Sequence, residues 1–239
     1  MAAFALPPTV VLVHGAWADG SSWSPVITDL RRAGIAVTAA PIPLTSLSED
    51  VGALNRTIDR TSGPVLLAAH AYAGAVIAAT DHPRVRGLVF IAALAPDEAE
   101  TVADVFYRGD SHPQAPQLAP DDAGWIWLPT DAFPTAFAQQ ASAEQHELLA
   151  AVQRPIAVQC IQQPVPRPGW KQLPSWYLIA EQDRMINPDT QRFMAKRMQA
   201  RIHSHDVDHA PLVSRPQVVT DMIAEALEHV ATDSESGGQ

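Results

Sequence analysis

The sequence predicts an α/β fold in which a mainly parallel sheet of about six strands is covered by helices on both faces. Two observations predict it. Short apolar runs alternate along the chain with longer, mixed segments that have helical character. The apolar runs are also nearly continuous, as in strands that are buried on both faces. With 47% hydrophobic residues among 239, the chain has enough apolar surface for one sizeable core.

The predicted strands are short runs, most of them rich in apolar residues. The first, "TVVLVHG", is rich in β-branched residues and closes at Gly15. The predicted strands cover residues 9–15, 35–43, 64–70, 85–94, 175–183 and 201–207.

The predicted helices carry recognisable start and stop signals. Ser46 and Glu49 have the spacing of a capping box, and Gly34 follows directly after the preceding helical segment. The predicted helices cover residues 21–34, 46–60, 72–80, 188–200 and 215–230.

One long segment interrupts the alternation of strands and helices. Residues 97–168 contain many prolines, two tryptophans and only short helical pieces, which predicts an inserted helical cap. The core is then expected to comprise residues 1–96 and 169–232. Residues 233–239 are small and polar, so we expect a disordered tail.

Composition excludes several classes of function. A net charge of -10 without any basic run argues against a nucleic-acid binder. Because no positively charged leader and no apolar stretch of about 18 residues is visible, we expect a cytoplasmic protein without membrane contact. The single cysteine, Cys160, excludes an internal disulfide, and its apolar neighbours predict an inert buried thiol.

No metal or other cofactor is expected. His203 and His205 lie close together in sequence, but on one predicted strand and without a second group of ligands. The expected partner is a small molecule. The sequence allows a homodimer but does not indicate one.

The stretch "LLAAHAYAGAV", residues 66–76, has the layout of a strand, a sharp turn and a helix that present one side chain at the turn. Ala69 and Ala73 supply the small side chains that such a strained turn needs on either side of its tip. The tip itself is Ala71, which has no functional group.

Four segments, "VLVHGAW", "LLAAHAYAGAV", "YLIAEQDRMINP" and "DHAPLVSRP", resemble the α/β-hydrolase superfamily. The similarity is greatest to the small esterase branch that includes plant methylesterases, hydroxynitrile lyases and bacterial relatives. The resemblance implies a catalytic triad in the order nucleophile, acid, histidine. Ala71 then stands where the family has its serine, Asp183 is the acid and His209 the general base.

The resemblance also implies an oxyanion hole formed by the backbone N–H groups of Ala16 and Tyr72. Asp97 remains an alternative acid, since some members of the fold take their acid after the preceding strand; its other interpretation is a helix cap.

Three hypotheses account for Ala71. In the first, which we prefer, alanine replaces the serine of an esterase for carboxylic esters with an apolar or aromatic group, so that this chain is an inactive variant. In the second, the alanine is natural and the His–Asp pair serves a lyase or a cofactor-free oxygenase. In the third, the chain is a catalytically dead ligand-binding module.

Aromatic residues gather in and beside the predicted cap. They form either the cap's own small core or the wall of an apolar substrate pocket. The candidates for the pocket are Trp17, Phe106, Tyr107, Trp125, Trp127, Phe133 and Phe137.

Overall fold

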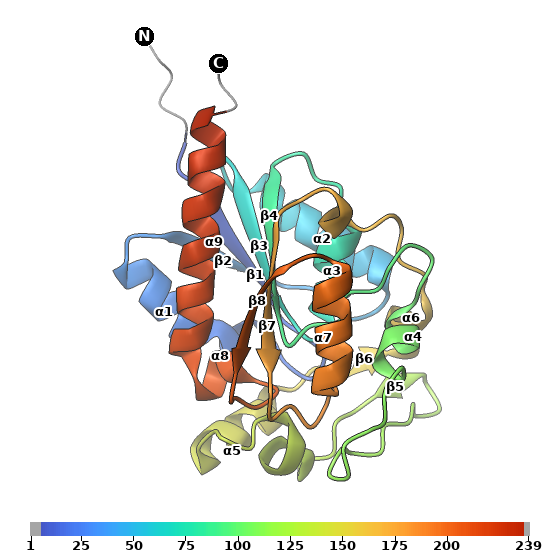
Figure 1. The fold of residues 1–239 in the computed structure, drawn as a ribbon. Helices are drawn as coiled ribbons and strands as arrows, with labels where there is room; N and C mark the ends of the chain where they lie inside the picture. The colour runs from blue at the N-terminus through green and yellow to red at the C-terminus, as the bar shows by residue number, and fades with distance from the viewer. Residues whose placement is uncertain (1–5, 237–239) are drawn as a thin grey trace.

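A six-stranded sheet forms the centre of the molecule (Figure 1). The structure is a computed structural model that describes residues 6–236. All strand pairs of this sheet are parallel, in the order β2-β1-β3-β4-β7-β8, which confirms the predicted fold class. The strands are β1 (Thr9–Val13), β2 (Ala36–Ala40), β3 (Val65–His70), β4 (Val85–Ile91), β7 (Ser175–Ala180) and β8 (Arg201–His205).

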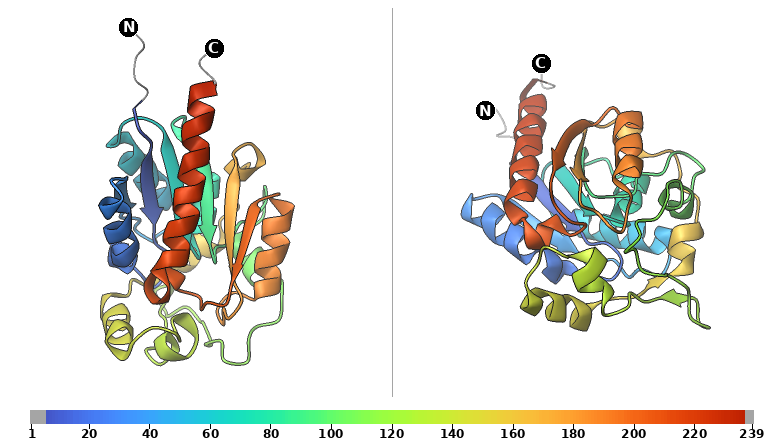
Figure 2. Two further views of the ribbon diagram at one scale, coloured as in Figure 1. Left: turned by 60° about the vertical axis from the view of Figure 1, so that its left-hand side comes forward. Right: turned by 60° about the horizontal axis from the view of Figure 1, so that its bottom comes forward.

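Helices cover both faces of the sheet (Figures 1 and 2). One face carries η1 (Gly20–Trp23), α1 (Ser24–Arg32), α8 (Pro211–Ser214) and α9 (Pro216–Ser236). The other carries α2 (Leu47–Asp59), α3 (Ala73–Ala79) and α7 (Pro188–Arg197).

The last helix is longer than predicted. Helix α9 continues to Ser236, so residues 233–236 of the expected disordered tail are helical, and residues 237–239 lie outside the described residues. The segment contains no proline or glycine before Gly237, so nothing in it breaks the helix.

The strand order creates a place for a ligand. The chain runs from β1 outward to β2 and then returns to the other side of β1 as β3. In parallel sheets, ligands bind at the carboxyl ends of the strands where the order reverses in this way. Val13 of β1 pairs with Ala69 of β3, so the loops that follow these two strands leave the sheet side by side.

In Figure 1, part of the segment between β4 and β7 lies below the arrowheads of β7 and β8, beyond the carboxyl ends of the strands, and part lies to the right of α3 and α7. It holds α4 (Val102–Phe106), β5 (Trp125–Ile126), the π-helix η2 (Phe133–Phe137), α5 (Ala143–Val152), β6 (Ile156–Ala157), α6 (Val158–Gln162) and η3 (Gly169–Lys171). Strands β5 and β6 form a small antiparallel pair that the sequence did not predict. We call residues 97–168 the insertion.

Within residues 6–236, none of the helices combines the length and the apolar composition that a membrane span requires.

Candidate active site

The turn after β3 holds Ala71 in a strained conformation. Its φ angle is 51°, in the left-handed region that residues with a Cβ rarely occupy. Two hydrogen bonds fix the turn, because the carbonyl oxygen of Ala71 accepts from the N–H groups of Leu94 at 2.9 Å and Gly74 at 3.1 Å. This turn is therefore held by its surroundings and does not depend on the side chain at its tip.

Two glycines permit the close packing around this turn. A Cβ on Gly74 would lie 2.4 Å from the carbonyl oxygen of Leu94, so only glycine lets α3 approach the segment after β4. A Cβ on Gly15 would lie 3.0 Å from both the Cβ of Ala71 and the carbonyl oxygen of His70. The loop after β1 thus passes directly beside the side chain of Ala71.

His209 and Asp183 form a buried hydrogen-bonded pair. The distance from His209 Nδ1 to Asp183 Oδ2 is 2.8 Å, and both residues are only 2% exposed. Asp183 follows β7 and His209 follows β8, two neighbouring strands whose carboxyl ends lie at the same edge. A carboxylate accepts hydrogen bonds only, so Nδ1 carries the proton and Nε2 remains as the basic nitrogen.

Further donors hold the carboxylate of Asp183 in place. Its Oδ1 accepts from the N–H groups of Met185 at 2.7 Å and Ile186 at 2.9 Å, and its Oδ2 accepts from Gln191 Nε2 at 2.8 Å. No motif in the sequence indicates Gln191, because a glutamine on a helix face belongs to no recognisable pattern. These bonds satisfy the buried charge and orient it toward the imidazole.

Asp97, the alternative acid, lies elsewhere. Its carboxylate pairs with Lys171 Nζ at 2.5 Å and accepts a hydrogen bond from the N–H of Glu98. Partial burial alone would raise the pKa of Asp97, but the hydrogen bonds from Lys171 and from the N–H of Glu98 together outweigh it and lower that pKa. In this structure Asp183 and not Asp97 contacts His209.

In the described chain, two backbone N–H groups in the loops after β1 and β3 have no protein acceptor. Within residues 6–236, neither the N–H of Ala16 nor that of Tyr72 donates a hydrogen bond to another protein group. Ala16 follows Gly15 in the loop after β1, and Tyr72 precedes α3. A pair of such donors at the same sheet edge suits an oxygen that carries negative charge.

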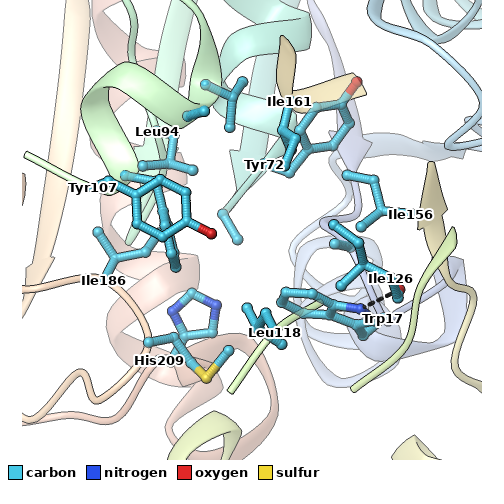
Figure 3. Close-up of a pocket in the computed structure, with 16 residues that line it drawn as sticks. Trp17, Tyr72, Leu94, Tyr107, Leu118, Ile126, Ile156, Ile161, Ile186 and His209 are labelled. Carbon is cyan, nitrogen blue, oxygen red and sulfur yellow. Dashed lines mark hydrogen bonds between the residues drawn. The ribbon is translucent and has the colours of Figure 1, made fainter. Parts of the chain in front are cut away.

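The insertion holds the loop of Ala16. The indole Nε1 of Trp17 donates to the carbonyl oxygen of Ile126 at 2.9 Å, the dashed line in Figure 3. The N–H of Trp17 donates to the carbonyl oxygen of Arg154 at 3.0 Å. Trp17 has a positive φ of 58°, so this second strained residue is also fixed by distant contacts.

His70 and Phe137 pack around His209. His70 Nε2 donates to the carbonyl oxygen of His209 at 2.7 Å, and the two rings lie 4.7 Å apart. The ring of Phe137 lies 5.2 Å from that of His209 at an angle of 67°. Burial, and then the proximity of His209, lower the pKa of His70 well below its usual range, so His70 is neutral in the folded protein.

An apolar cavity opens over Ala71 and His209 (Figure 3). Within the described chain, its lining includes no Asp, Glu, Lys or Arg. The lining residues are Ala16, Trp17, Ala71, Tyr72, Leu94, Val102, Ala103, Phe106, Tyr107, Leu118, Ile126, Ile156, Ile161, Met185, Ile186 and His209.

Only some of the aromatic candidates line this cavity. Trp17, Phe106 and Tyr107 do so. The structure places the other four outside the lining. Phe133 and Phe137 are buried against each other with ring centroids 5.4 Å apart, as a small core of the insertion.

Trp125 and Trp127 instead flank a groove on the outer surface, and Trp127 is 52% exposed. Alternation along β5 explains this, since Ile126 between them faces the cavity and its neighbours therefore point away.

A second buried polar cluster lies behind the cavity wall. Tyr72 Oη donates to Asp50 Oδ2 at 2.7 Å, the N–H of Leu44 donates to Asp50 Oδ1 at 2.7 Å, and Cys160 Sγ lies 3.7 Å from Asp50 Oδ2. Burial raises the pKa of Asp50, and burial together with the Asp50 charge raises that of Cys160 to about 12. The Cys160 thiol is thus protonated and buried, as its sequence context predicts.

No cluster of three or more His, Cys, Asp or Glu side chains in the described part of the chain is arranged to hold a metal ion.

Comparison with known proteins places this architecture in a family. A model described as "Alpha/beta hydrolase family" matches residues 10–222, nearly the whole length of the chain. The chain belongs to the alpha/beta hydrolase family. The resemblance noted from the sequence is thereby confirmed at the level of the family.

Individual relatives of this alpha/beta hydrolase are distant. A "probable hydrolase R7" from Phoma sp. is 23% identical, with 91% of this chain and 97% of the relative covered. A pyrethroid hydrolase from Sphingobium faniae JZ-2 has a similar structure, with a TM-score of 0.79, 22% identity and coverage of 92% of this chain and 98% of that one. A methylesterase from Arabidopsis gives a TM-score of 0.76 at 16% identity, with 94% and 100% covered. At these identities the two solved structures show a shared fold.

Proposed function

We propose that this alpha/beta hydrolase carries the site of a serine-dependent carboxylic ester hydrolase in which Ala71 stands in the position of the nucleophile. The observation that carries the proposal is the buried His209–Asp183 pair beside a left-handed turn at Ala71, with a cavity that both His209 and Ala71 line. The geometry supplies a general base, an acid that orients it and a strained turn that presents one side chain.

The chemistry follows from the groups at the cavity. A serine hydroxyl at the turn would give its proton to His209 Nε2 and attack the ester carbonyl carbon. The N–H groups of Ala16 and Tyr72 would hold the carbonyl oxygen as it becomes negative. His209 would then return the proton to the departing alkoxide.

The lining of the cavity indicates the kind of ester. Trp17, Phe106 and Leu94 present apolar surface, and no lining side chain is charged at neutral pH unless His209 is protonated. Uncharged esters with an apolar or aromatic group are therefore the proposed substrates. The relatives named as a pyrethroid hydrolase and a methylesterase are compatible with this proposal.

Replacement of Ala71 by serine tests the proposal. Because loss of the nucleophile costs on the order of 10⁶ in rate in a serine hydrolase, Ala71→Ser is expected to raise the hydrolysis of short p-nitrophenyl esters by at least about 10³-fold. The rates of p-nitrophenolate release by the two proteins measure this. A correctly folded Ala71→Ser protein that hydrolyses none of these esters would overturn the proposal.

A further inference from the structure

Three hydrogen-bonding groups without a protein partner in the described residues belong to residues that line the cavity together with Ala71. They are Nε2 of His209, which Asp183 leaves as the basic nitrogen, and the N–H groups of Ala16 and Tyr72. The rest of the cavity lining is almost entirely apolar. A water molecule in this cavity can donate a hydrogen bond to His209 Nε2, and the carbonyl oxygen of a bound ester can accept from the two N–H groups.

We propose that the chain with its own Ala71 hydrolyses activated esters directly, with a water molecule beside Ala71 as the nucleophile and the His209–Asp183 pair as the general base. The inference rests on the proposed function, because it uses the same cavity and the same oxyanion donors. It differs in the reaction route, since no covalent acyl-enzyme forms.

The steps balance without any further reactant. His209 Nε2 takes a proton from water while the water oxygen bonds to the ester carbonyl carbon, and the carbonyl oxygen becomes an oxyanion held by the N–H groups of Ala16 and Tyr72. The tetrahedral intermediate collapses with cleavage of the bond to the leaving oxygen. The alkoxide takes the proton from His209, so one ester and one water give one carboxylic acid and one alcohol.

The surroundings of Ala71 favour this route. Gly15 has no side chain, and a Cβ there would lie 3.0 Å from the Cβ of Ala71, so glycine lets the loop that carries Ala16 pass close to the turn. His209 is fixed from two sides, by Asp183 at Nδ1 and by His70 at its carbonyl oxygen. A histidine that is held in one orientation can accept a proton from a water molecule, whereas a mobile histidine would not be aligned with that water.

The same cavity selects the substrate by charge. No lining residue carries a positive side chain that would bind a carboxylate. The carboxyl group of Asp50 lies behind the ring of Tyr72, hydrogen-bonded to its hydroxyl at 2.7 Å. An ester whose acyl group is uncharged is therefore preferred over an ester whose acyl group carries a carboxylate.

The test compares the unmodified chain with His209→Ala and with His112→Ala, a matched control at an exposed histidine outside the site. With p-nitrophenyl butyrate, we expect the unmodified chain to exceed the uncatalysed rate by about 10⁵-fold, of which about 10³-fold comes from the oxyanion donors and binding and about 10²-fold from His209 as general base. His209→Ala is expected to lower that rate by about 100-fold or more, because general-base catalysis contributes at least that much. His112→Ala should leave it unchanged.

Mass spectrometry of acid-quenched protein separates the two routes. During turnover the unmodified chain is expected to keep its own mass, whereas Ala71→Ser should carry one butyryl group. An acylated unmodified chain would contradict the direct route.

Failure of this inference is distinguishable from failure of the proposed function. If Ala71→Ser is active and the unmodified chain reacts equally fast with and without His209, direct hydrolysis is overturned while the esterase site stands. If circular dichroism shows both proteins folded and neither hydrolyses any ester, both proposals fail.

Discussion

At the scale of single residues, the hydrogen bonds of Asp183 distinguish it from Asp97, the other candidate acid. It accepts from His209 Nδ1 and from three further N–H groups, whereas Asp97 is partly exposed and paired with Lys171. The carboxylate of Asp183 therefore fixes the tautomer of His209, whereas the carboxylate of Asp97 has no contact with that histidine.

The two acids therefore predict different kinetic effects. In the Ala71→Ser background, Asp183→Asn is expected to lower kcat for p-nitrophenyl esters by about 10⁴-fold, because an amide no longer favours the required tautomer. Asp97→Asn is the matched control and should leave kcat nearly unchanged. Equal losses in the two variants would show that Asp183 has no special role.

Two glycines in helices predict opposite effects of the same substitution. Gly74→Ala places a Cβ within 2.4 Å of a backbone oxygen, so we expect the free energy of unfolding to fall by about 1–3 kcal/mol. In Gly52→Ala, the nearest atom is the flexible end of Arg56 at 3.4 Å, and the higher helix propensity of alanine should add about 0.5–1 kcal/mol. Urea denaturation of the two variants measures both effects, and a stabilised Gly74→Ala would contradict this account of the turn.

At the scale of elements, Asp50 joins three parts of the molecule. It lies in the first turn of α2 and contacts the loop after β2 through Leu44, the turn after β3 through Tyr72, and α6 of the insertion through Cys160. Figure 3 shows the Tyr72 ring at the cavity wall with its hydroxyl directed away from the cavity. The cluster thus fixes a wall of the cavity from behind.

Removal of one hydroxyl tests this connection. Tyr72→Phe leaves the buried carboxyl of Asp50 without one of its donors, so we expect the free energy of unfolding to fall by about 1–3 kcal/mol. Tyr107→Phe is the matched control, since Tyr107 is 61% exposed, and a change within about 0.5 kcal/mol is expected. Equal stability of the two variants in urea denaturation would contradict the role of the cluster.

The elements of the sheet could be predicted because their signals are local. Apolar runs of strand length and a cap such as Ser46, whose hydroxyl accepts from the N–H of Glu49, need only a few neighbouring residues. The insertion was harder, because pairing of Ile126 with Ile156 joins residues far apart in sequence. For the same reason, the sequence alone does not distinguish the aromatic residues that line the cavity from those that do not. Trp17 lines the cavity, whereas Phe137 packs beside His209.

At the scale of the whole molecule, two buried histidines couple the fold to pH. Burial is the main cause that lowers the pKa of His70 and of His14, so both are neutral in the folded chain. In the unfolded chain they bind protons below a pH of about 6.5. The unfolded state then binds more protons than the folded state, so stability falls as the pH is lowered through this range.

His70 gives the sharper test of this dependence. Between about pH 6.5 and 5, the unfolding free energy should fall by up to about 1.4 kcal/mol per pH unit for each such histidine. His70→Gln removes one titrating group, so its slope should be smaller by that amount, while the exposed control His112→Gln keeps the slope of the unmodified chain. Identical slopes for all three proteins in urea titrations at several pH values would show that His70 does not titrate as described.

The central claim is that Ala71 occupies the nucleophile position of an otherwise assembled hydrolase site. Covalent labelling tests it most directly, because diethyl p-nitrophenyl phosphate reacts with a serine that a histidine activates. Ala71→Ser is predicted to take up one diethylphosphoryl group, located at position 71 by peptide mass spectrometry, and the unmodified chain is predicted to take up none. An unlabelled, folded Ala71→Ser protein, or a label at another residue, would contradict the claim.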